Sequence, residues 1–307
     1  MEPFIRGTIS GTLATPPIIV PFAAALLFPF IIMALKRAME LNRDPWLTLL
    51  VSNLAIALVF LPLFAWDGKP ASLDKIWQPV AAGFVFFIAQ VAAFKSFATG
   101  DLSVAIPAQG TKVLLVAGFT LLLIGENVGP RQWGAAGLTV VAIHFLQDRE
   151  SGKRSRARLV ATLAYALLAS VAFAAFDVSV QKWTPEWGME RFGPWVFLCQ
   201  AVLSISLLWF PGRRRWVHPA RTWLWLGAGA LGMALITFAL VLVIGVYGKA
   251  TLVNILFNSR CVWSVVFVWL MGSWFANKEA QSGGQRAMAH RLIGAGFMMA
   301  AIGLALG

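Results

Sequence analysis

Residues 100–119, GDLSVAIPAQGTKVLLVAGF, align without a gap with residues 248–267, GKATLVNILFNSRCVWSVVF. In this overlay Lys112 meets Arg260, and each cation directly follows a residue with a hydroxyl group. A cation near the middle of a membrane span costs on the order of 2.5 to 3.5 kcal/mol on insertion scales, so it usually faces a cavity or a partner. The paired stretches therefore predict an internal duplication with a polar centre.

The composition is that of a helical membrane protein. Hydrophobic residues make up 59% of the chain and charged residues only 12%, which excludes an ordinary soluble domain. Apolar runs of the length that crosses a bilayer as a helix recur along the chain. Ten runs are predicted to span the membrane, roughly 14–35, 46–66, 77–98, 102–125, 130–147, 158–181, 193–210, 222–246, 249–275 and 290–307.

The charge distribution argues against a nucleic-acid partner. The formal net charge is +12, but the Lys and Arg residues gather in short loops, where they orient membrane helices. We therefore expect a lipid bilayer and a small-molecule substrate as partners, and no nucleic acid. Cys199 and Cys261 lie in apolar runs, which predicts buried free thiols without a disulfide.

A basic loop, QDRESGKRSRAR at 147–158, divides the chain into two halves that resemble each other. Two further matches occur in the same order, DPWLTLLVSNL with GPWVFLCQAVL and QWGAAGLTVVAI with RLIGAGFMMAAI. The predicted organisation is a first five-helix repeat at 1–147, a basic connecting loop at 148–157 and a second five-helix repeat at 158–307.

Because five is odd, the second repeat enters the membrane from the opposite side. The predicted fold class is therefore an all-α membrane protein with ten transmembrane helices in two inverted five-helix repeats. Secondary transporters commonly have this plan, with the binding site near the midplane between the halves. Duplication within one chain makes a monomer sufficient. Small residues at 134–137 and 294–296 predict close helix packing, centred on Gly137 and Gly296.

The segment LLLIGENVGPRQWGAAGLTVVAI at 121–143, with its partial echo near the end of the chain, resembles the drug/metabolite transporter superfamily, EamA-like branch. The resemblance covers nearly the whole chain. It implies a ten-helix carrier, multi-pass in the bacterial cytoplasmic (inner) membrane, that needs no cofactor. It does not identify the substrate.

Lys112 and Arg260 occupy equivalent places in an inverted repeat, so they can converge at the centre. The predicted spans offer only Asp177 as a carboxylate partner, near the end of the sixth span. One carboxylate cannot neutralise two cations, so we interpret the pair as an anion-binding site. The alternative is structural pairing with Asp177 and backbone carbonyls.

Side chains at helical spacing extend the predicted site. Gln109 and Phe257 each lie three residues before a cation, while Asn254 and Asn258 fit interhelical hydrogen bonding equally well. The predicted substrate-binding set is Lys112, Arg260, Gln109, Phe257, Trp263, Ser264, Asn254, Asn258 and Gln90.

The two cations are similar in placement to basic residues on the fourth and ninth helices of the plastid phosphate translocators. Those carriers have adjacent basic residues on the ninth helix, whereas here Cys261 follows Arg260. The anion therefore stays open among phosphate esters, phosphonates, sulfonates and carboxylates.

The predicted function is a secondary transporter for a small anionic organic metabolite, working by alternating access and as an exchanger. Two alternatives are a flippase for an anionic lipid or lipid-linked sugar, and an exporter of neutral amino acids or drugs. An enzyme is not expected, because the sequence has no catalytic motif such as H-E-x-x-H or G-x-S-x-G. A proton-driven cation exporter is disfavoured by the apparent lack of a central carboxylate.

Lys and Arg are more frequent in the loops after the odd-numbered predicted spans than in those after the even-numbered ones. The positive-inside rule then places the 147–158 loop in the cytoplasm and both termini outside. A cysteine introduced by Ser151→Cys should react with an impermeant maleimide only after cells are permeabilised. Labelling of intact cells would mean the opposite orientation.

Overall fold

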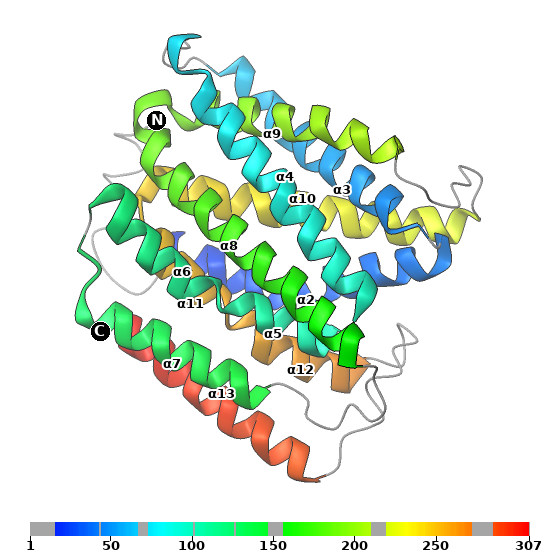
Figure 1. Cartoon of the computed structure of the whole chain (residues 1–307), viewed down its shortest axis with the longest axis vertical. Helices are drawn as coiled ribbons and strands as arrows, with labels where there is room; N and C mark the ends of the chain where they lie inside the picture. The colour runs from blue at the N-terminus through cyan, green and yellow to red at the C-terminus, as the bar shows by residue number, and fades with distance from the viewer. Residues whose placement is uncertain are drawn as a thin grey trace.

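The computed structural model describes residues 16–42, 44–66, 73–100, 102–125, 127–146, 156–209, 219–271 and 285–306, and within these ranges all regular structure is helical (Figure 1). The helices are α2 (Pro16–Asn42), α3 (Pro45–Phe60), α4 (Trp77–Thr99), α5 (Leu102–Gly110), α6 (Lys112–Phe119), α7 (Pro130–Leu146), α8 (Arg156–Trp187), α9 (Met189–Ile205), α10 (Ala220–Tyr247), α11 (Ala250–Phe257), α12 (Arg260–Met271) and α13 (Gln285–Leu306). Short turns of other helix types are η1 (Leu61–Ala65), η2 (Leu73–Lys75), η3 (Thr120–Ile124) and η4 (Ser206–Trp209).

Six helices in the described ranges are long and apolar enough to cross a membrane. They are Pro16–Asn42, Pro45–Ala65, Trp77–Thr99, Ala157–Trp187, Met189–Trp209 and Ala220–Tyr247. These helices confirm the prediction of an all-helical, multi-pass membrane protein. The count of ten spans stays a prediction, in part because the fourth and ninth predicted spans are each divided into two shorter helices.

Local sequence signals set where helices begin and end. The Asp44 carboxylate accepts hydrogen bonds from the amides of Trp46 and Leu47, at 3.0 and 3.1 Å, and so caps the first turn of α3. Gly248 ends α10 with a φ of 63°, a left-handed conformation that glycine adopts without steric cost. The sharp stop at Gly248 lets α11 begin almost at once, at Ala250.

The two divided spans break at the same place in the overlay of residues 100–119 on residues 248–267. The Thr111 amide donates to the Ala108 carbonyl at 3.4 Å, and the Ser259 amide donates to the Leu256 carbonyl at 3.1 Å. Both bonds reach back three residues instead of four, which tightens the turn. The Thr111 and Ser259 hydroxyls each donate to the same carbonyl as their own amide, both at 2.8 Å. A hydroxyl residue at each break therefore stabilises the same local departure from the α-helix.

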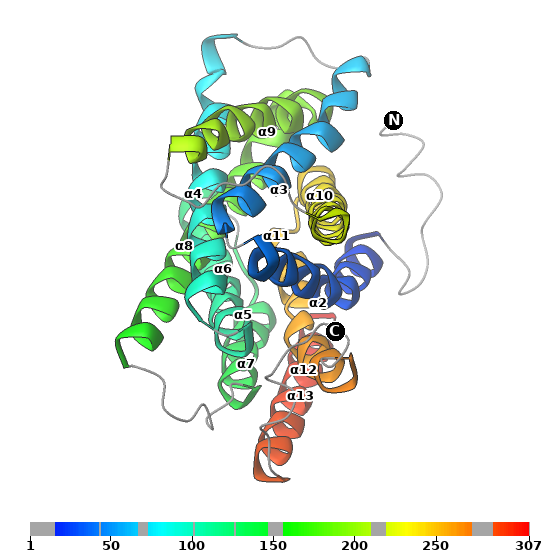
Figure 2. The ribbon, with the colours of Figure 1, turned by 90° about the vertical axis from the view of Figure 1, so that its right-hand side faces the viewer.

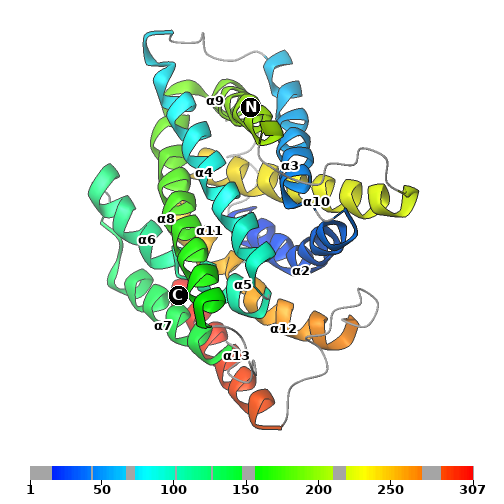
Figure 3. The same cartoon turned by 45° about the vertical axis from the view of Figure 1, so that its right-hand side comes forward.

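The helices pack in a few close pairs. α4 lies along α8, α10 lies along α2, and α3 packs on α9. α7 and α13 lie side by side at one end of the molecule, far from α3 and α9 (Figures 1 and 3). Each divided helix packs against α7 or α13 on one side and against α2 or α8 on the other, and α11 also packs on α6 (Figure 2).

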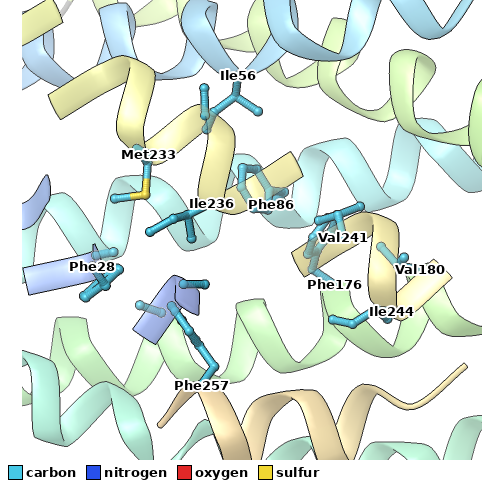
Figure 4. Packing of buried hydrophobic residues seen from close by; sticks show 14 of the residues in the cluster. Phe28, Ile56, Phe86, Phe176, Val180, Met233, Ile236, Val241, Ile244 and Phe257 are labelled. Atoms are coloured by element: carbon cyan, nitrogen blue, oxygen red, sulfur yellow. The ribbon is translucent and has the colours of Figure 1, made fainter. Parts of the chain in front are cut away.

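Aromatic side chains join these pairs into one core. The Phe60 and Phe197 rings stack with centroids 4.1 Å apart, and the Phe86 ring lies 4.6 Å from that of Phe176 and 5.2 Å from that of Phe197. Figure 4 shows Phe86 and Phe176 next to residues of α10 such as Val241. Since lipid is as apolar as these side chains, the contacts stabilise the fold through shape and ring geometry, at roughly 0.5 to 1.5 kcal/mol per aromatic pair.

Close helix approach involves only some of the predicted glycines. A Cβ added at Gly134 of α7, within the predicted stretch 134–137, would lie 3.1 Å from Leu304 Cδ2 of α13. At Gly137 and Gly296, by contrast, an added Cβ would meet no atom within 4 Å, although α7 and α13 pack on each other. The predicted tight contact at these two glycines is therefore wrong. The closer approach is at Gly83 of α4, where a Cβ would lie 2.4 Å from the Val196 carbonyl oxygen of α9. Small residues in the sequence did not reveal which of them face a backbone.

Gly83→Ala should therefore lower the melting temperature of the purified protein, because the backbone of α9 must move away from the new methyl group. Gly118→Ala is the matched control, since Gly118 lies inside α6 and a Cβ there meets nothing within 4 Å. Alanine also favours a helix over glycine by roughly 1 kcal/mol. Equal melting temperatures for the two variants would show that α4 and α9 do not need this contact.

Candidate functional site

The two cations, of which Arg260 is buried and Lys112 is partly buried, begin the second segments of the divided helices. Lys112 is the first residue of α6, and Arg260 is the first residue of α12. The two breaks touch each other, because the Asn258 side-chain amide donates to the Gly110 carbonyl at 2.7 Å. Gly110 and Asn258 also occupy the same position in the overlay of the two stretches. Both cations therefore lie close to the point where the two overlaid stretches contact each other.

Lys112 is paired with a carboxylate. Its Nζ lies 2.6 Å from Asp177 Oδ2, and the Asn254 side-chain amide donates to the same oxygen at 2.7 Å. The Lys112 Nζ also lies 5.4 Å from the centroid of the Phe173 ring. The structural pairing that the sequence left open as an alternative is thus present for Lys112.

Asp177 lies deeper in the protein than the sequence predicted. We expected it near the end of its helix, but α8 continues to Trp187 and Asp177 is only 5% exposed. The statement that no carboxylate lies in the centre is therefore wrong. The error came from ending the sixth span at the polar residues after 181, which α8 includes.

Arg260 has a different environment. Its side chain is buried, and its guanidinium carbon lies 4.3 Å from the Phe257 ring centroid and 4.7 Å from that of Phe28. The two rings meet edge to face at 5.5 Å. Such contacts stabilise a desolvated cation by roughly 2 kcal/mol each but do not neutralise it.

The polar atoms of Arg260 are incompletely satisfied. Its Nε is buried without a hydrogen-bond partner, and no carboxylate of the described residues lies within ion-pair distance of its guanidinium. A buried cation in this state is costly unless a further group supplies negative charge. The arrangement can therefore accept an anion.

The remaining predicted residues have different surroundings in the structure. Asn254 and Asn258 make the interhelical hydrogen bonds described above. Gln109 also bonds between helices, since its amide donates to the Ser96 hydroxyl at 3.1 Å, and Gln90 is buried in α4. Trp263 stacks on Phe267 with centroids 6.0 Å apart, while the side chain of Ser264 lies outside the described part of the structure.

Sequence reasoning missed one contact of this region. Phe28 of α2 contacts Arg260, but an apolar residue in an apolar helix gives no sequence signal. A second polar group joins α3 and α9, where the Asn53 amide donates to the Ser204 hydroxyl at 2.8 Å. Asn53 Oδ1 and both polar side-chain atoms of the buried Gln200 have no partner among the described residues.

Comparisons with known proteins agree with this architecture. Residues 15–146, which include α2 to α7 and Lys112, match the profile of the EamA-like transporter family. The resemblance to the EamA-like family is confirmed. The matched segment corresponds to the predicted first repeat, and the six apolar helices are those of an integral, multi-pass membrane protein.

A solved structure has a similar fold over nearly the whole chain. One crystal structure, titled "Crystal structure of protein", is similar with a TM-score of 0.71 over 94% of this chain and 98% of that chain, at 18% sequence identity. At this identity the similarity concerns the fold alone. No curated protein matches the sequence.

The Lys112–Asp177 ion pair should stabilise the folded protein. Asp177→Asn alone leaves the buried ammonium of Lys112 uncompensated, and removing one partner of a buried pair costs about 3 to 5 kcal/mol. The double variant Lys112→Gln, Asp177→Asn removes both charges and should regain most of the lost melting temperature. If Asp177→Asn melts like the wild type, the pair does not contribute to stability.

Proposed function

We propose that this protein is a secondary transporter that carries a small anionic organic metabolite by alternating access, with Arg260 as the anchor for the anion. The observation that carries the proposal is the buried, unneutralised guanidinium of Arg260. A planar guanidinium presents several donors to carboxylate, sulfonate or phosphate oxygens, which suits each of these groups. The family match supports transport in general, without naming the solute.

An inverted repeat with ten spans gives this site its position. Helix contacts occur in pairs that exchange under the overlay: α4 packs on α8 as α10 packs on α2, and α6 packs on α8 as α12 packs on α2. The contact between Gly110 and Asn258, which are equivalent residues, supports a pseudo-two-fold axis beside the two cations. On this proposal the halves are 1–147 and 158–307, and the anion binds between them.

On this proposal the charge on Arg260 favours exchange over net flux. Rocking of one half against the other about an occupied site exposes the solute alternately to the two sides. An empty site leaves the guanidinium without a counter-charge while the halves close around it, which raises the energy of the closed state. Return of the empty carrier is therefore slow, and exchange of one anion for another exceeds net flux.

Arg260→Gln should reduce anion uptake into proteoliposomes roughly ten- to a hundredfold, because the variant loses a desolvated charge that pairs with the solute. Arg221→Gln is the matched control, since Arg221 is an exposed cation in the first turn of α10. Uptake is measured with and without unlabelled counter-substrate inside the vesicles, and the counter-substrate should accelerate it.

Two other outcomes would contradict the proposal. If neutral or zwitterionic solutes are carried well and Arg260→Gln retains that activity, Arg260 is structural and the protein is a carrier of neutral amino acids or drugs. If a fluorescent anionic lipid changes leaflet in proteoliposomes while soluble anions are not carried, the protein is a flippase.

A further inference from the structure

The site around Lys112 and Arg260 holds more positive than negative charges. Lys112 and Arg260 are cations, and Asp177 is the anion that pairs with Lys112 at 2.6 Å. Other side chains of the described structure that interact with these three are Asn254, which donates to Asp177, the thiol of Cys261 next to Arg260, and aromatic rings that carry no formal charge. The site therefore has one net positive charge.

The excess of one positive charge comes from a single difference between the two proposed halves. The match of DPWLTLLVSNL with GPWVFLCQAVL, carried back along the preceding helices, sets Phe28 of α2 opposite Asp177 of α8. Phe28 contacts Arg260, and Asp177 contacts Lys112, so the two residues have the same role toward equivalent cations. One half supplies a carboxylate and the other half supplies a phenyl ring.

We infer that Asp177 sets the charge of the transported solute by cancelling Lys112, so that the site selects a monoanion bound at Arg260 over a dianion. This inference rests on the proposed function and names the charge class of its substrate. A monoanion leaves the occupied site neutral. A dianion leaves one uncompensated negative charge in an apolar interior, where unpaired charge is strongly disfavoured. Phosphate monoesters, which are dianions at pH 8, should therefore be poor substrates.

The Asp177 carboxylate is bound by residues other than Arg260. Its Oδ2 is held by Lys112 and by the Asn254 amide, and Asn254 is itself fixed by a hydrogen bond to the Ala250 carbonyl at 2.9 Å. Arg260 instead lies against Phe28 and Phe257, with its Nε unpartnered. The two cations thus have separate tasks, one balanced within the protein and one available to the solute.

The test uses two probes with the same phosphate chemistry and different charge at one pH. Propyl phosphate is a dianion at pH 8, and methyl propyl phosphate is a monoanion. Each is offered as a competitor of anion exchange in proteoliposomes containing the full-length protein. Wild type should prefer the monoanion by at least about tenfold, and Arg260→Gln should lose both.

Variants at the Lys112–Asp177 pair distinguish the effect of the net charge of the site from the effect of losing the ion pair itself. Asp177→Asn raises the net charge of the site by one and should reverse the preference toward propyl phosphate. The double variant Lys112→Gln, Asp177→Asn restores the wild-type net charge without an unpaired lysine, so it should again prefer the monoanion. The double variant and the wild type also test the inference if Asp177→Asn alone fails to fold.

The outcomes distinguish the two proposals. If the wild type exchanges no anion, or if the esters compete with Arg260→Gln as they do with the wild type, the proposed anion transport through Arg260 fails. If the wild type exchanges anions but neither ester competes, anion transport stands and the inference about Asp177 is wrong. If both esters compete through Arg260 but wild type prefers the dianion, anion transport stands and the inference about Asp177 is wrong. The inference is also wrong if the double variant changes the preference, because its net charge equals that of the wild type.

Discussion

The organisation of this protein depends on keeping two cations inside an apolar bundle. A charge there must be paired, packed against aromatic faces or given a solute as its partner. The chain uses the first solution for Lys112, through Asp177, and the second for Arg260, through Phe28 and Phe257. Only the pairing of Lys112 cancels a charge, so the bundle retains one cation that an anion can still neutralise.

Two interrupted helices make this arrangement possible. An unbroken α-helix satisfies its own backbone, whereas each break here shifts to bonds that reach back three residues and brings a polar turn to the middle of the bundle. The Asn258 amide then bonds to the Gly110 carbonyl, so the two breaks support each other. The cations that begin α6 and α12 are held near this junction, while the continuous helices α2 and α8 provide their partners.

Much of this could be predicted from the sequence because it is encoded locally. Apolar run length indicated membrane helices, and the overlay of 100–119 on 248–267 brought Lys112 and Arg260 into equivalent positions. Phe257 was predicted beside Arg260 because the two are one helical turn apart, and the structure has this contact. The breaks could have been anticipated from the hydroxyl that precedes each cation, since it can bond back to the preceding turn.

The sequence by itself determined that this is a membrane protein, that it is helical, and where its two central cations lie, because run length, composition and spacing act within single segments. Only the tertiary structure decided which cation is neutralised and which is not. That choice depends on α8 bringing Asp177 to Lys112 and on α2 bringing Phe28 to Arg260, across long separations in the chain. The close approach at Gly83 was also decided by the tertiary structure, because the need for a glycine there depends on the backbone of α9 that faces it. Contacts between distant helices are set by packing geometry, and no local pattern encodes them.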